Sequence, residues 1–432
     1  MMKKILILWL SVLTMAAYAQ TSSKFKSLPL ANGSPESVGM SSERLARIDS
    51  FCLNAVSEGK VPGIVALVAR NGKIVYHKAF GMDDKASDKP MKKDDIFRIA
   101  SQTKAITSTA VMMLWEEGKF GLDDPISKYI PEFKNPQVLK TFEPKDTTYT
   151  TEPAKSEITI RQLLCHTSGL GYGFIDSDPR IKAIYAKAGI IEAWTTERVL
   201  ISDNIKKLAK LPLRANPGEA YNYCMGLDVL GYFIEVVSGM PFDVFLKKRL
   251  FEPLGMTDTW FYLPKEKVSR LVTVQTLIDG KWSKLTGSGS FDPDYPVKGA
   301  KTIFSGGGGL SSTAKDYATF LQMYLNAGEL NGKRFLSRTT IQTIMANNIG
   351  NLWGENPDLF YGLAFAVVTQ KGHEKGGLGS AGSFGWGGAF NTQYFADPKE
   401  KVIGIIMKQT YGQVADDTDW KFRILVSQAI DD

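Results

Sequence analysis

Histidine and cysteine are scarce in this chain, and their scarcity argues against several kinds of enzyme. The 432 residues include only three of each. The histidines are His77, His166 and His373, and the cysteines are Cys52, Cys165 and Cys224. They are too few and too dispersed for a zinc site, which needs closely spaced ligands. The odd number of cysteines requires no disulfide framework, although one disulfide remains possible in an oxidising compartment.

A nucleophile elbow is also missing. No serine has a glycine both two positions before it and two positions after it, as the Gly-x-Ser-x-Gly turn of α/β-hydrolases demands. Histidine is the usual general base, but His77 lies in a predicted strand and His373 in a glycine-rich loop. We interpret His166 as a structural hydrogen-bonding residue ahead of a turn rather than as a base.

The chain has no strongly one-sided charge pattern and no long apolar span. The formal net charge is +7, with basic residues scattered along the sequence, which favours solubility over nucleic-acid binding. The apolar run Ile5–Leu13 is short for a membrane span. Because it follows two lysines and precedes Ala17-Tyr18-Ala19, it predicts a signal peptide over residues 1–19 and export to the periplasm or beyond. The cleavage point has no cysteine, so a lipid anchor is not indicated.

Strand signals are concentrated in the two ends of the chain, and helix signals in the middle. Two hairpins are predicted, Ile64–Ala69 with Ile74–Tyr76 and Asn391–Ala396 with Lys401–Met407. Helices are predicted from Ser41 or Ser42 to Gly59, from Ser101 to Glu117, over Gly226–Val237, from Pro241 to Leu250, over Ala314–Leu325 and over Asp419–Ala429. The polar stretch Asp146–Glu157 is predicted to be a surface loop.

These signals predict an α/β fold of the α+β type. The simplest assembly is one antiparallel sheet built from both chain ends, flanked by helices, with a mostly helical domain inserted between them. The predicted units are a loose arm over residues 20–40, a sheet domain over 41–122 and 303–432, and a helical insert over 123–302.

What the sequence does contain is a Ser-x-x-Lys pattern at the junction of a predicted strand and a predicted helix. Ser101 and Lys104 follow the apolar run 96–100, and residues three apart share one face of a helix. A serine alcohol becomes a good nucleophile when a neighbouring base takes its proton. A lysine is a base only when it is neutral, a form that burial and nearby positive charge favour. Ser101 is therefore a candidate catalytic serine.

The pattern alone is weak evidence, because it occurs four times. The other copies begin at Ser23, Ser57 and Ser312. Ser312 is the serious rival, since it too opens a helix, but Ser312 or Thr313 is well suited to cap that helix. By the same reasoning Ser101 itself could be only a cap.

Several segments resemble the serine β-lactamase and penicillin-binding superfamily, in its class C-like branch of esterases and D-amino-acid peptidases. The segments cover residues 97–104, 116–125, 158–170 and 251–256 in the family's order. The resemblance extends over most of the chain after residue 40. It implies that Ser101 is the nucleophile and Lys104 its partner.

The family's second motif, Tyr-x-Asn, corresponds to Tyr223-Cys224-Met225. The resemblance makes Tyr223 the base or proton relay, with Tyr221 as the alternative assignment. Met225 stands where β-lactamases have an asparagine that binds a substrate amide, which puts lactam recognition in doubt.

The third motif, a Lys-Thr-Gly strand, corresponds to Trp386-Gly387-Gly388-Ala389. Glycines on an edge strand let a substrate approach the backbone, and the N–H groups of Ala389 and Ser101 are suited to form an oxyanion hole. Trp386 removes the positive charge of the family's lysine, and Trp-Gly-Gly variants resemble the family VIII carboxylesterases. A glycine loop with only a structural role is the alternative. The run Ser305–Leu310 lacks the ending of a phosphate loop, and we interpret it as structural.

The resemblance thus predicts an exported serine hydrolase that cleaves a small ester or amide through an acyl-enzyme. It implies no cofactor, no metal and no nucleic-acid partner, and it leaves the oligomeric state open. A β-lactamase and a D-Ala-type peptidase share the same machinery. A non-catalytic protein that binds cell-wall material or peptides on this fold is the alternative from another class.

Overall fold

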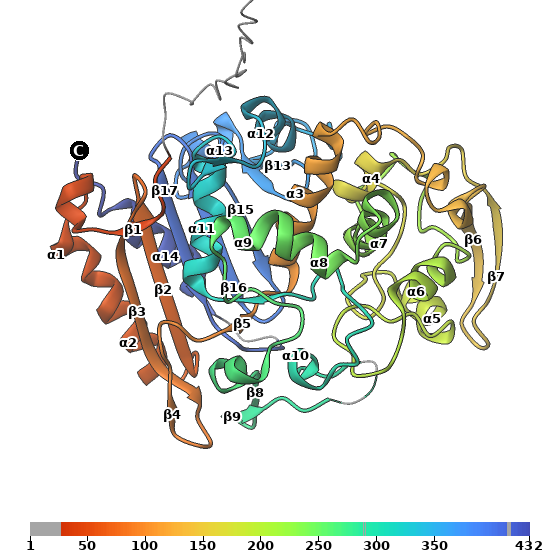
Figure 1. Ribbon diagram of the computed structural model, residues 1–432. Coiled ribbons are helices and arrows are strands. Elements are labelled where there is room, and N and C mark those ends of the chain that lie inside the picture. Colours follow the sequence, from red (N-terminus) through yellow and green to blue (C-terminus); the bar gives the residue numbers. More distant parts are fainter. Residues whose placement is uncertain (1–26, 288, 290, 413–415) are drawn as a thin grey trace, which may run out of the picture.

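A large mixed β-sheet with helices on both faces forms the body of the protein in the computed structural model, which describes residues 27–287, 289, 291–412 and 416–432 (Figure 1). The signal peptide predicted over residues 1–19 lies outside the described residues. In spatial order the strands are β1 (Ala31–Asn32), β3 (Lys73–Asp84), β2 (Gly63–Arg70), β17 (Val402–Met407), β16 (Thr392–Asp397), β15 (Phe384–Gly388), β14 (Ala366–Val368) and β13 (Leu359–Tyr361), and β4 (Lys89–Pro90) pairs with β3. The expected sheet from both chain ends is confirmed.

One edge of the sheet departs from the prediction. Every neighbouring pair of strands is antiparallel except β1 with β3, which is parallel. The segment 27–40, part of the predicted loose arm, supplies β1 and the short helix η1 (Pro35–Val38). The amides of Ala31 and Gly33 donate to the carbonyls of Gly72 and Ile74, so main-chain pairing holds a segment whose side chains gave no strand signal.

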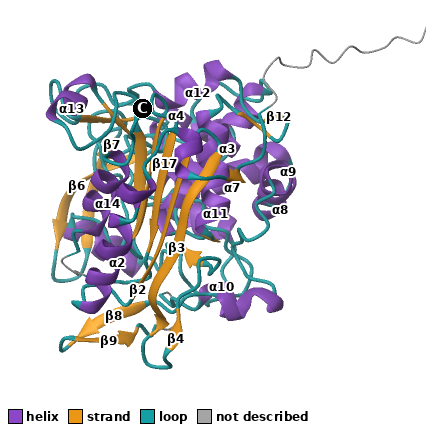
Figure 2. Ribbon diagram, turned by 90° about the vertical axis from the view of Figure 1, so that its left-hand side faces the viewer, coloured by secondary structure: helices purple, strands orange, loops and turns teal. Residues whose placement is uncertain are grey.

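Alternation along β2 divides the core into two layers. Ile64, Ala66 and Val68 pack on one side of the sheet, whereas Val65, Leu67 and Ala69 pack on the other. This is the period of two expected of a strand buried on both faces. On the first face lie α1 (Ser42–Leu45), α2 (Arg47–Ser57) and α14 (Thr418–Ser427), of which the last two are labelled in Figure 2. On the second face lie α3 (Thr103–Glu116) and α11 (Ala314–Leu325).

The middle of the chain, which the sequence predicted to be a helical insert, supplies most of the remaining helices. Its helices are η3 (Ile126–Lys128), η4 (Pro131–Phe133), α4 (Ile160–Leu164), α5 (Pro179–Lys187), α6 (Ile201–Leu208), α7 (Gly226–Ser238), α8 (Phe242–Leu246), η5 (Lys247–Phe251, a π-helical turn), α9 (Glu252–Leu254), η6 (Lys265–Arg270) and α10 (Tyr295–Lys298). Within the described ranges, no single helix has the length and apolar character to cross a membrane. The bent pair Gly226–Ser238 and Phe242–Leu254, at 79°, meets those criteria jointly.

The insert also contains two hairpins that the sequence did not reveal. They pair β6 (Gln137–Glu143) with β7 (Thr148–Pro153), and β8 (Gln275–Ile278) with β9 (Lys281–Lys284). The prediction of a loop over Asp146–Glu157 was therefore wrong for β7. Every residue of β7 is exposed, so the strand lacks the apolar alternation that identifies a half-buried strand. Its Thr and Tyr residues nevertheless favour extended backbone.

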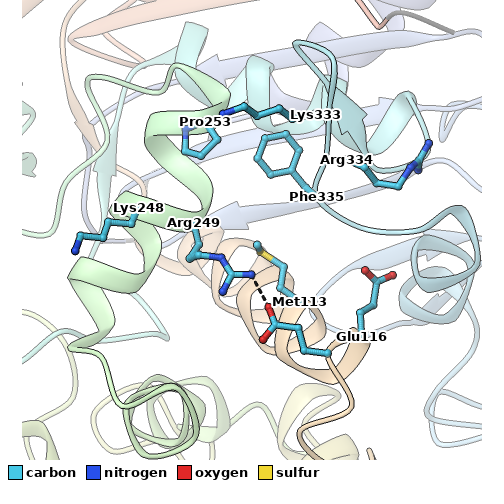
Figure 3. Close-up of a pocket in the computed structure, with 9 residues that line it drawn as sticks. Met113, Glu116, Lys248, Arg249, Pro253, Lys333, Arg334 and Phe335 are labelled. Atoms are coloured by element: carbon cyan, nitrogen blue, oxygen red, sulfur yellow. Dashed lines mark hydrogen bonds and ion pairs between the residues drawn. The ribbon is translucent and has the colours of Figure 1, made fainter. Parts of the chain in front are cut away.

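Short elements complete the fold and join the two units. They are β5 (Phe97–Arg98), η2 (Ala100–Gln102), β10 (Ser311–Ser312), β11 (Glu329–Leu330), β12 (Lys333–Arg334), α12 (Arg338–Met345) and α13 (Gln370–Lys375). At the C-terminal end of α3 an ion pair between Arg249 and Glu117 connects the insert to the sheet domain beside a cavity of about 420 Å³ (Figure 3). Ser101 lies in η2, immediately before the other end of α3.

Candidate active site

Ser101 sits at a sharp turn between a strand and a helix. The strand β5 ends at Arg98, and the 3₁₀ turn η2 leads directly into α3, so the helix begins slightly later than predicted. The residue before the serine, Ala100, has φ +43°, a left-handed conformation that costs free energy for any residue except glycine. Such backbone strain is often found at functional sites.

Lys104 lies one helical turn further on, beneath the serine. Its Nζ is 3.2 Å from Ser101 Oγ and donates a hydrogen bond of 2.6 Å to the carbonyl of Gly307. The side chain has no exposed surface. The strand-to-helix register therefore brings the hydroxyl and the amine together, as the Ser-x-x-Lys spacing predicted.

The glycine run that supplies the acceptor for Lys104 is held by Asp228 of α7. The Asp228 carboxyl accepts hydrogen bonds from the Ser305 hydroxyl and from the Gly307 amide, the latter at 3.2 Å. Burial raises the pKa of Asp228, while its hydrogen bond from Ser305 acts in the opposite direction. A side chain at Gly307 would collide with this carboxyl. The run thus combines its predicted structural role with a direct contact to Lys104.

Tyr223, rather than Tyr221, is the tyrosine that meets this pair. Lys104 Nζ lies 4.6 Å from the centroid of the Tyr223 ring, and Trp386 Nε1 is 3.4 Å from the Tyr223 hydroxyl. Tyr221 instead packs against Trp353, with 4.9 Å between ring centroids. Of the two assignments left open by the sequence, the structure brings only Tyr223 to Lys104.

Tyr172 is a further neighbour that the sequence did not reveal. Its hydroxyl is 3.4 Å from Lys104 Nζ, and its ring stacks on that of Tyr223 with 5.5 Å between centroids and 17° between planes. Complete burial raises the pKa of Tyr172 well above its ordinary value. No local pattern could have identified it, because 68 positions separate it from Lys104.

His166 occupies a structural position beside these tyrosines. Its Nδ1 accepts the amide N–H of Cys224 at 3.2 Å, and its ring centroid is 4.5 Å from that of Tyr223. Burial holds the pKa of His166 well below its usual range. His373 lies in α13 rather than in a loop. Cys52, Cys165 and Cys224 are all buried and free.

Trp386, Gly387 and Gly388 form the end of β15 that faces η2. β15 is an inner strand, not the edge strand expected, but β14 pairs only with residues 384 and 385. Residues 386–388 therefore keep one edge free of strand pairing. A side chain at Gly388 would collide with the carbonyl of Ile99, so this strand end runs close against the turn that holds Ser101. Ala389 follows immediately.

Comparison with known proteins identifies the family. The Beta-lactamase family matches residues 46–428. This chain belongs to that family. Esterase EstB of Burkholderia gladioli is 29% identical over 82% of this chain and 87% of its own length. A putative D-alanyl-D-alanine carboxypeptidase of Escherichia coli K12 is 26% identical over 90% and 87%.

A solved structure extends the comparison to three dimensions. EstCE1, described as a hydrolase with promiscuous acyltransferase activity, superposes with a TM-score of 0.76 at 25% identity, over 89% of this chain and 98% of its own. The protein is therefore a serine hydrolase of the beta-lactamase fold, with relatives among esterases, acyltransferases and peptidases. In the described part of the chain, no group of three or more His, Cys, Asp or Glu side chains is arranged to hold a metal ion.

Proposed function

We propose that this protein is an exported esterase that cleaves small carboxylic esters through an acyl-enzyme on Ser101. The observation that carries the proposal is the 3.2 Å approach of Lys104 Nζ to Ser101 Oγ in a site where the lysine is completely buried. A buried amine at that distance is placed, in its neutral form, to take the serine proton.

The reaction then runs in two steps. Ser101 Oγ attacks the ester carbonyl carbon while its proton passes to Lys104, and the N–H groups of Ser101 and Ala389 stabilise the oxyanion. The carbon–oxygen bond to the alcohol breaks as Tyr223 and Lys104 return the proton to the leaving oxygen. Water attacks the acyl-enzyme by the reverse proton route and releases the carboxylic acid. No cofactor takes part.

Two substitutions at family positions favour an ester over a lactam. Met225 is buried at the start of α7 and offers no amide to a substrate. Trp386 offers an indole, whose N–H is directed to Tyr223, in place of a positive charge that would bind a substrate carboxylate. The similarity to an esterase from Burkholderia gladioli agrees with this choice.

Peptide cleavage is the second candidate. It is favoured by the similarity to the putative carboxypeptidase of Escherichia coli, which extends over 90% of this chain. Ester cleavage and peptide cleavage would both use Ser101, Lys104 and Tyr223. They differ in the substrate that binds beside these residues. A side-by-side panel of short p-nitrophenyl esters, a chromogenic cephalosporin and a D-Ala-ended peptide ranks them, and we expect the esters to be turned over fastest.

The nucleophile is tested by Ser101→Ala beside its internal control, Ser312→Ala. The first variant should lose p-nitrophenyl acetate turnover and labelling by a fluorophosphonate probe while keeping its circular dichroism spectrum. Ser312→Ala should keep both the turnover and the probe labelling. Unchanged turnover in Ser101→Ala would refute the proposal, and a probe adduct located elsewhere by mass spectrometry would do the same.

Export is supported by the charged and apolar leader before Ala17-Tyr18-Ala19. Expression of the full chain in a bacterium should yield a mature protein beginning at Gln20 in the periplasmic fraction. An intact Met1 in a cytoplasmic product would contradict this part of the proposal.

A further inference from the structure

Five aromatic side chains from separate segments form a cluster next to the turn that carries Ser101. They are Phe174, Trp194, Phe291, Phe390 and Tyr411. Adjacent ring centroids lie between 4.6 Å (Trp194 to Phe390) and 5.9 Å (Phe390 to Tyr411). Trp194 and Phe390 are buried together with Ala100, the residue before the nucleophile. Phe291 and Tyr411 are partly exposed, and Phe174 is 39% exposed.

This cluster is linked to the reacting groups at three points. Phe390 follows Ala389, the second oxyanion donor of the proposed mechanism. Trp194 Nε1 donates a 2.9 Å hydrogen bond to the carbonyl of Gly308, next to the carbonyl that accepts from Lys104. Phe174 lies two residues after Tyr172, whose hydroxyl is 3.4 Å from Lys104 Nζ. An apolar group attached to a carbonyl at Ser101 would therefore be within short reach of the rings.

The backbone that carries the exposed Phe174 is held in place by buried carboxyl groups. Glu192 Oε1 accepts the amide N–H of Phe174, and Asp176 Oδ2 accepts that of Tyr172, each at 2.7 Å. Both carboxyl groups are buried. The ring itself packs against Trp194 and Phe291. Because the backbone is held and the ring is packed on one side, little conformational entropy is lost when a ligand binds.

A second aromatic group lies beside Tyr223 and contains Trp386, Tyr361, Tyr221 and Trp353. Among the described residues no ring contact joins the two groups. In the proposed mechanism Tyr223 returns the proton to the leaving alcohol, so the alcohol lies toward Trp386. The acyl group then lies on the other side, toward the cluster of Phe174, Trp194, Phe291, Phe390 and Tyr411.

We infer that this cluster is the acyl-binding surface and that the preferred substrates are esters of acids bearing an aromatic ring. This inference rests on the proposed esterase function and names its substrate class. Rings placed against Phe174 and Phe291 gain offset or edge-to-face contacts beyond simple burial of apolar surface. Phe174 is the specificity-determining residue, and Glu192 positions it through its amide.

The test compares two esters that share a leaving group, p-nitrophenyl acetate and p-nitrophenyl 3-phenylpropanoate. In the wild type, kcat/KM should be higher for the phenylpropanoate. In Phe174→Ala the ratio of the two kcat/KM values should fall roughly tenfold, mainly through KM, because about 1.4 kcal/mol of contact is a factor of ten and aromatic contacts are of that order. Phe174→Tyr should restore most of the ratio.

Tyr149→Ala is the matched control. Tyr149 is a 37% exposed aromatic residue in β7 that takes no part in the ring contacts of the cluster, and its loss should leave the ratio unchanged. An unchanged ratio in Phe174→Ala, with both esters equally affected or neither affected, would overturn the inference and leave the esterase function intact. A wild type that hydrolyses neither ester would overturn the proposed function itself.

Discussion

Two copies of Ser-x-x-Lys lie side by side in this fold and differ in almost everything that matters for chemistry. β5, which leads to Ser101, pairs with β10, which contains Ser312, and each strand leads into a helix. In the first copy the lysine is buried and 3.2 Å from the serine. In the second, Lys315 is exposed, and the Ser312 hydroxyl instead lies 2.8 Å from that of Thr259.

The two copies also differ in the backbone turn that precedes each helix. At the second copy Thr313 caps α11 in the ordinary way: its backbone is extended, and its hydroxyl accepts the amide of Asp316. At the first copy no side-chain cap is present, and a left-handed Ala100 and a 3₁₀ turn place Ser101 one residue inside the helical segment. In the capped copy the lysine is exposed to water, whereas after the strained turn it is buried beneath the serine.

The strongest test of this difference between the two copies is to replace each lysine by glutamine. Lys104→Gln keeps a donor for the Gly307 carbonyl but removes the base, so ester turnover should fall by about 10³-fold, within the range of general-base contributions. Lys315→Gln should change turnover less than about twofold, because its side chain is in solvent. Steady-state kinetics with p-nitrophenyl acetate measures both. Equal losses in the two variants would mean that the two copies are not chemically distinct.

The proton relay is the next largest expected effect. Tyr223→Phe removes a hydroxyl while keeping the ring over Lys104, and kcat should fall about 10²-fold, at the lower end of acid–base contributions. Tyr221→Phe is the matched control, since its ring packs against Trp353 and does not meet Lys104. A larger loss in Tyr221→Phe would reverse the assignment made from the geometry.

The sequence predicted the groups that are close along the chain or belong to a family motif. Ser101 and Lys104 are three positions apart, and the hairpins and helices of the sheet domain follow from periodicity. The strand β7 was not predicted, because its side chains are all exposed and leave no apolar alternation in the sequence. The strand β1 was not predicted either, because two residues of parallel pairing are too few to give a periodic signal.

The missing parts of the site share a physical cause as well. Tyr172, Asp228 and the carbonyl of Gly307 reach Lys104 or its acceptor only through the tertiary fold. The aromatic cluster likewise draws on segments more than two hundred positions apart. Burial decides which polar groups matter at the site, and burial is a property of the packed chain rather than of any local pattern.

Two buried carboxyl groups, those of Glu192 and Asp316, should make the stability of the two regions depend on pH in different ranges. Burial raises the pKa of Glu192, near the first copy, to about 8, and that of Asp316, in the second, to about 6. A raised carboxyl pKa means that the folded state binds more protons than the unfolded chain between the two values. The contribution to stability is therefore complete below the unfolded pKa and is lost as pH rises through the folded one.

We therefore expect Glu192→Gln to flatten the fall in stability between about pH 4.5 and pH 8, and Asp316→Asn to flatten it only between about pH 3.8 and pH 6. The Glu192→Gln variant keeps the hydrogen bond from the Phe174 amide, because a side-chain amide oxygen still accepts it. Urea midpoints at pH 5, 6 and 8, taken as variant minus wild type, separate the two windows. Between pH 6 and pH 8 only Glu192→Gln should gain relative stability, by at most a few kcal/mol at about 1.4 kcal/mol per pKa unit. A flat difference there would show that the Glu192 carboxyl is hydrated in the folded protein, contrary to its burial.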